Sequence, residues 1–226
     1  MGLLSRLFGK RRQASPLESF LQNTTLDSSR LSYRNVSEQD LKLPSAISIW
    51  ALHISHRFCL GLRKMLEGLD TSTLAIAIEG AVYDSVAVEV AGFCFFYLMN
   101  DLLREAEDQE EEDPYLSILK TSATLANSIL NSHLASSVDA DYLLKRVVNY
   151  SSANVSAKTN SLERFAAVLL SSIAARQPTL RVTSPPINLA LQVTIPIYIP
   201  IFHSTYLLEF KKAARVMYLA DREGAL

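Results

Sequence analysis

Residues 74–99 read LAIAIEGAVYDSVAVEVAGFCFFYLM, and this stretch decides the fold. Its only acidic interruptions are Glu79, Asp84 and Glu89. At 100° per residue, apolar side chains occupy every side of such a helix, which is typical of the centre of a helical bundle or of a membrane segment. A lone buried charge costs several kcal/mol, so we expect some of these carboxylates to have partners in the folded chain.

A β structure for part of this stretch is the alternative. Residues 74–78 and 86–90 both alternate along the chain, and Glu79 with Gly80 would form the turn between them. The apolar pattern continues to Leu103, however, which is too long for one strand. We therefore favour a single central helix over about residues 74–104.

The composition predicts a folded chain that is rich in helix. Of the 226 residues, 49% are hydrophobic and 20% are charged, with 7 Gly and 8 Pro, which argues against disorder. The net charge of −1 gives no field that would recruit nucleic acid. The only cysteines, Cys59 and Cys94, offer neither a disulfide framework nor a zinc spacing. Because the first residues also lack a secretory signal pattern, we expect a cytoplasmic protein.

The chain divides into an arm and a domain. Residues 1–44 are a basic, amphipathic N-terminal arm with a polar linker, and residues 45–226 are one helical domain. No repeat of fixed spacing is visible, so a solenoid is not supported. The expected fold class is mainly α, a single helical bundle around the buried central helix.

Capping patterns predict where two of the helices begin. Inside the arm, Ser15, Pro16 and Glu18 match an N-cap, a first-turn proline and a capping-box acid. Further along, Asp113 followed by Pro114 is the same kind of start signal. We expect a short helix at the first site and a longer one at the second.

The C-terminal section departs from the helical pattern. Residues 182–202 are rich in β-branched side chains and contain Pro185, Pro186, Pro196 and Pro200. Because proline inside a soluble helix costs about 3 kcal/mol, we expect a short extended or β segment near residues 182–202. The uncharged residues at 187–208, followed by basic ones, also fit a membrane-embedded protein that spans at about 187–208, which is an alternative.

The N-terminal segment, residues 1–12, carries the most usable functional pattern. It combines an apolar sector with four positive charges and has no acid. The candidate side chains for binding a membrane or a partner are Leu3, Leu4, Arg6, Leu7, Phe8, Lys10, Arg11 and Arg12. Such a segment can attach reversibly to an anionic membrane surface. The alternatives are a disordered terminus, a segment docked on its own domain, and an organellar targeting peptide, which has the same pattern.

A metal site is the second chemical possibility. His53, His56 and Cys59 lie three residues apart, but each step turns the helix face by 60°, so one ion cannot easily reach all three. A His53/His56 pair completed by Glu89 is the sharper alternative. We otherwise expect Glu89 to pair with an arginine, a tyrosine or an amide. The arginine candidates are Arg57, Arg63 and Arg104.

The sequence favours a protein without catalytic activity. It contains no phosphate-binding loop, nucleophile elbow or metalloprotease motif, and no catalytic set converges. We expect a non-catalytic interaction or scaffold protein that uses residues 1–12 to associate peripherally with a membrane surface or a partner protein. No cofactor and no nucleic acid are implied, and the oligomeric state stays open. The alternative is a metal-binding protein or enzyme with a site around His53, His56 and Glu89.

Overall fold

The computed structural model describes residues 14–23, 43–68, 78–106, 113–156, 161–176 and 185–223. These ranges form helices and contain no strand. In chain order the helices are α2 (Pro16–Asn23), α3 (Leu43–Gly68), α5 (Gly80–Ala106), α6 (Pro114–His133), α7 (Tyr142–Ser156), α8 (Ser161–Arg176), α10 (Pro185–Phe202), η3 (His203–Leu207) and α11 (Leu208–Arg222). The predicted mainly α bundle is confirmed over the described part of the chain.

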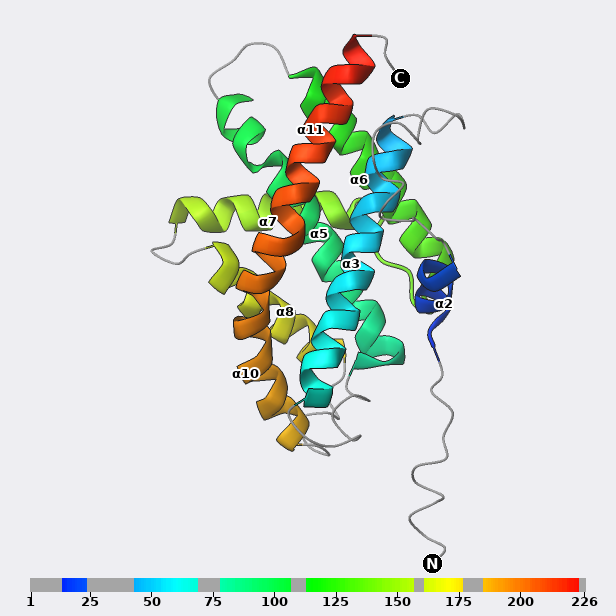
Figure 1. Cartoon of the computed structure of the whole chain (residues 1–226), viewed down its shortest axis with the longest axis vertical. Coiled ribbons are helices and arrows are strands. Elements are labelled where there is room, and N and C mark those ends of the chain that lie inside the picture. Colours follow the sequence, from blue (N-terminus) through cyan, green and yellow to red (C-terminus); the bar gives the residue numbers. More distant parts are fainter. Residues whose placement is uncertain are drawn as a thin grey trace, which may run out of the picture.

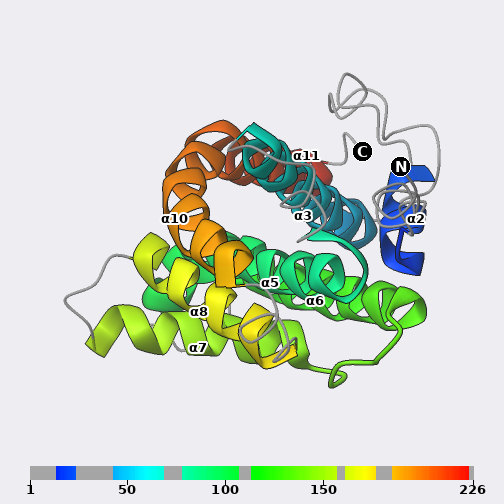
Figure 2. The same cartoon turned by 90° about the horizontal axis from the view of Figure 1, so that it is seen from below.

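Helix α5 is the centre of the bundle. In Figure 2, α3 and α10 lie on one side of it and α7 lies on the other. Residues 82–96 are all buried, as a helix with apolar residues on every side requires. The central helix is thus confirmed, and the strand alternative is wrong for residues 86–90.

The central helix begins later than the sequence predicts. Its first residue, Gly80, has a φ of 53°, a left-handed conformation that glycine adopts without steric cost. This conformation separates α5 from the short turn at Ile78. Residues 74–77, which the prediction included in the helix, lie outside the described residues.

The two predicted capping sites are confirmed. The hydroxyl of Ser15 accepts a hydrogen bond from the backbone N–H of Glu18 at 3.0 Å, at the start of α2. The carboxylate of Asp113 accepts one from the backbone N–H of Tyr115 at 2.7 Å, and Pro114 opens α6. Each cap satisfies a donor that the first turn of a helix leaves without a partner.

Helix α2 packs onto the bundle although it lies within the predicted arm. It contacts α3, α5 and α6, and Figure 1 shows it at the edge of the molecule. Leu17 and Leu21, one turn apart on the same side, are both buried. Residues 16–23 therefore contribute to the folded core.

Residues 185–202 form the helix α10, so the extended or β segment expected near residues 182–202 is wrong for these residues, and residues 182–184 lie outside the described part of the chain. Pro196 and Pro200 lie inside this helix and are exposed to solvent. The opposite side packs against α3 and α8. Between residues 189 and 202, the buried residues are Leu191, Thr194, Ile195, Tyr198, Ile199 and Phe202. The hydrogen bonds lost to proline therefore fall on the hydrated side, while burial of the inner side stabilises the helix.

Two glycines allow neighbouring helices to approach closely. A Cβ atom at Gly61 of α3 would lie 1.8 Å from the hydroxyl oxygen of Tyr198 on α10. A Cβ atom at Gly92 of α5 would lie 2.9 Å from the Cβ of Arg146 on α7. Both distances are shorter than van der Waals contact. These helix pairs can therefore lie this close only because glycine has no side chain.

A turn of π-helix, η3, joins α10 to α11. The backbone N–H of Leu208 donates to the carbonyl of His203, five residues earlier. Buried apolar residues before and after η3 follow steps of three or four, but the step from Phe202 to Leu207 is five. A π turn holds one extra residue. It therefore keeps the apolar side of α11, including Phe210, turned toward the bundle.

Candidate functional site

The N-terminal binding segment predicted from the sequence lies outside the described residues. All eight of its candidate side chains, between Leu3 and Arg12, precede residue 14, where the described chain begins. Their role stays a prediction. Among the described residues, three groups of side chains are candidates for function: two buried polar clusters and one exposed apolar face.

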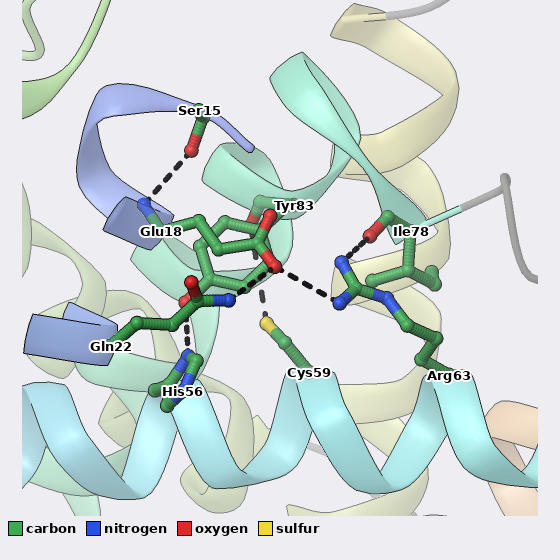
Figure 3. Close-up of polar contacts among 8 residues, drawn as sticks. All are labelled: Ser15, Glu18, Gln22, His56, Cys59, Arg63, Ile78 and Tyr83. Atoms are coloured by element: carbon green, nitrogen blue, oxygen red, sulfur yellow. Dashed lines mark hydrogen bonds and ion pairs between the residues drawn. The ribbon is translucent and has the colours of Figure 1, made fainter. Parts of the chain in front are cut away.

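The first cluster lies beneath α2, between α3 and α5 (Figure 3). The Nδ1 atom of His56 lies 2.6 Å from the hydroxyl oxygen of Tyr83. Burial lowers the pKa of His56 to about 4, and neighbouring basic side chains act in the same direction. Burial also raises the pKa of the Tyr83 hydroxyl. Both groups are therefore neutral near pH 7 and share a hydrogen bond that carries no net charge.

Glu18 and Arg63 form the charged part of this cluster. The Nη1 of Arg63 donates to a carboxylate oxygen of Glu18 at 2.9 Å, and its Nη2 donates to the carbonyl of Ile78 at 2.6 Å. The two charged side chains are 5% and 3% exposed. The amide of Gln22 donates to the same oxygen of Glu18. Sequence reasoning missed this pair because it used Glu18 only as a capping residue and considered Arg63 as a partner for Glu89.

The two cysteines occupy different places in the core. In Figure 3 the thiol of Cys59 points from α3 toward Glu18 and Tyr83. Cys94 lies within the central helix α5. Both thiols are fully buried, and burial raises the pKa of each. They therefore stay protonated and protected while the helices remain packed.

The second cluster surrounds Glu89 on α5. Arg146 of α7 donates to a carboxylate oxygen of Glu89 at 2.7 Å, and the hydroxyl of Tyr142 donates to the same oxygen. The Glu89 side chain is 2% exposed and that of Arg146 is 24% exposed. The expected pairing with an arginine or a tyrosine is confirmed. The arginine, however, is none of the three that sequence reasoning considered.

The described residues offer no metal centre. Nowhere among them do three His, Cys, Asp or Glu side chains lie close enough together to hold a metal ion. His56 is engaged by Tyr83, and Glu89 is engaged from α7. The structure therefore does not bring His53, His56 and Glu89 together as a three-ligand set.

A half-open cavity of about 270 Å³ lies beside the start of α5. Its lining consists of Ala81, Asp84, Leu134 and residues 135–137. Among the described residues of this lining, Asp84 is the one ionisable side chain. The cavity thus lacks the paired acid and base, or nucleophile and base, that general acid–base or covalent catalysis uses.

The third group is an exposed apolar face on α10. It consists of Leu189, Val193, Pro196, Ile197, Pro200 and Ile201, and we refer to it as the α10 outer face. Its four aliphatic side chains are 50% to 62% exposed. Single exposed apolar residues are ordinary on a soluble protein, whereas a continuous row of them is a candidate surface for contact with another molecule or a membrane.

Two of the described helices are long and apolar enough to cross a membrane. They are Gly80–Leu103 and Leu189–Arg222, and core helices of soluble proteins pass the same test. Of the 18-residue apolar stretch in the first helix, 78% is buried inside the bundle, compared with 39% of the corresponding stretch in the second. Only the second therefore keeps much of its apolar surface available to lipid or protein.

Comparison of the chain with protein-family models, with curated proteins and with solved structures finds no match. Its function must therefore be inferred from its own side chains. The two polar clusters lie inside the bundle and are paired internally, which is typical of structural groups. The α10 outer face is the candidate that solvent, lipid or a partner can reach directly.

Proposed function

We propose that this protein is a non-catalytic interaction protein that associates peripherally with a membrane surface through the α10 outer face. The observation that carries the proposal is the row of half-exposed aliphatic side chains on a segment, residues 189–208, that contains no Asp, Glu, Lys or Arg. Such a surface gains free energy when it leaves water. The basic residues 1–12 are a second contact, suited to anionic lipid. A cytoplasmic location stays a prediction.

The prolines of α10 favour a helix in the plane of the interface over one that spans the bilayer. Pro196 and Pro200 have no N–H, so the carbonyls of Gln192 and Pro196 lack the usual helical donor four residues later. In hydrocarbon an unpaired carbonyl costs several kcal/mol, whereas water can bind it at the level of the headgroups. The inner side of α10 also remains packed on α3 and α8. These contacts support peripheral attachment rather than a span at 187–208.

Vesicle co-sedimentation of the full chain tests this proposal. Ile197→Glu places a charge in the middle of the α10 outer face, and we expect at least a tenfold loss of binding to anionic vesicles, or about 1.4 kcal/mol. Val148→Glu is the matched control because Val148 is 61% exposed but lies on α7. We expect this control to bind as the wild type does.

Four other outcomes would redirect the assignment. Equal binding of wild type and Ile197→Glu would overturn the role of the α10 outer face, and salt-sensitive binding that survives the substitution would assign the contact to residues 1–12. A wild-type dimer in solution that Ile197→Glu dissociates, without vesicle binding, would assign the face to a second copy of the chain. Resistance to extraction by alkaline carbonate would favour the spanning alternative.

A further inference from the structure

Helix α2 is attached to the bundle by a small set of side chains. With eight residues, it is too short to be stable in isolation. Leu17, Glu18 and Leu21 are its buried members. Phe20 adds a stacked contact with His133, with 4.0 Å between the ring centroids. The helix therefore depends on docking contacts along one side for its existence.

The groups beneath α2 keep hydrogen-bond partners of their own. Arg63 donates to the carbonyl of Ile78 independently of Glu18, and His56 remains paired with Tyr83. If α2 leaves, Glu18 and Arg63 both regain water, which offsets much of the loss of their ion pair. When α2 departs, each polar group of this cluster that loses a hydrogen-bond partner therefore gains access to water.

We propose that α2 is a detachable helix that opens as a unit while α3 and α5 stay packed. Opening separates Glu18 from Arg63 and uncovers Cys59, and it does not depend on the proposed membrane function.

The two cysteines provide a direct test in the full chain, without lipid. Cys59 lies beneath α2, and Cys94 lies in the central helix, so only the first gains access when α2 opens. A thiol reagent such as DTNB, under native conditions, is expected to modify Cys59 faster than Cys94. Mass spectrometry of the digested protein assigns each rate to its cysteine.

Glu18→Gln is the variant that should release α2. We expect it to accelerate modification of Cys59 at least tenfold and to leave Cys94 unchanged. Glu89→Gln is the matched control, because it breaks the other buried ion pair, which joins α5 to α7, without touching α2. We expect it to produce no selective acceleration at Cys59.

Two results would overturn the proposal. One is equal rates at the two cysteines in the wild type together with equal acceleration of both in Glu18→Gln, since this is the behaviour of a bundle that opens only globally. The other is a Cys59 rate that Glu18→Gln does not change. Because no vesicle is present, either result is independent of whether the α10 outer face binds lipid.

Discussion

Helices α5 and α10 are both rich in apolar residues, but α5 lies at the centre of the bundle and α10 lies at its edge. The central helix α5 contains Asp84 and Glu89, yet both are almost completely buried. The uncharged helix α10 lies at the edge and exposes one apolar side. The difference teaches that the number of neighbouring helices, rather than the charge content of a segment, decides whether its apolar surface is covered. A buried helix can hold a carboxylate if a neighbour supplies the partner, as Arg146 does for Glu89.

Truncation of one side chain in each helix should give the largest contrast. Phe93 of α5 is fully buried and stacks on Phe165, with 4.0 Å between the ring centroids. Phe93→Ala is expected to lower the free energy of unfolding by about 3–5 kcal/mol. Ile197→Ala on the α10 outer face should change it by less than about 0.5 kcal/mol. Urea unfolding followed by circular dichroism measures both, and similar losses would contradict the assigned positions.

A methyl group at the contact between α3 and α10 should give an intermediate effect. Gly61→Ala places a Cβ against the Tyr198 hydroxyl, and we expect a loss of about 1–3 kcal/mol in the free energy of unfolding. Hydrogen exchange should accelerate in α10 and remain slow in α5. Gly68→Ala, at the last residue of α3, is the control for an added methyl group that meets no described atom of another element within 4 Å. Equal exchange in α10 for the two variants would mean that Tyr198 moves without loosening its helix.

Two histidines that each bond to a tyrosine of α5 compare a buried site with a partly exposed one. His56 of α3 bonds to Tyr83 near the start of α5, and His203, the first residue of η3, bonds to Tyr97 further along α5. Burial lowers the pKa of both histidines, to about 4 for His56. His203 is the more exposed of the two, so desolvation opposes its protonation less. NMR titration should resolve two distinct values in that order. A single common value would show that the two surroundings do not differ.

The shift of His56 also sets a pH dependence of stability. Its pKa is about 4 in the folded chain and about 6.5 in the unfolded chain, so the unfolded chain binds the proton first as pH falls. Stability should therefore decrease between about pH 6.5 and pH 4 and level off below, by about 1 kcal/mol once partial hydration is allowed for. His56→Gln should lack this part of the decrease in denaturation experiments.

The sequence predicts the parts of the fold that depend on local patterns. The burial of α5 follows from its apolar composition, and the starts at Ser15 and Asp113 follow from capping within one turn. The sequence does not predict helix α10, because the cost of Pro196 and Pro200 in a helix depends on whether they face water. That orientation depends on packing against α3 and α8, which no local pattern contains.

The polar clusters show the same limit. The type of partner for Glu89 followed from the cost of burying a charge. Its identity, Arg146, lies 57 residues away in the chain and depends on how α7 crosses α5. Glu18 and Arg63 were each noted for other roles, because their proximity is created only when α2 docks.

The number of residues in the π turn at His203–Leu207 determines which side of α11 faces the bundle. One residue fewer between α10 and α11 would restore an ordinary α-helix and rotate the 15 residues of α11 by about 100°. Phe210 would then swing away from the bundle without any change of side chain. A single insertion or deletion in this turn would therefore rotate α11 about its axis and change which of its side chains contact the bundle.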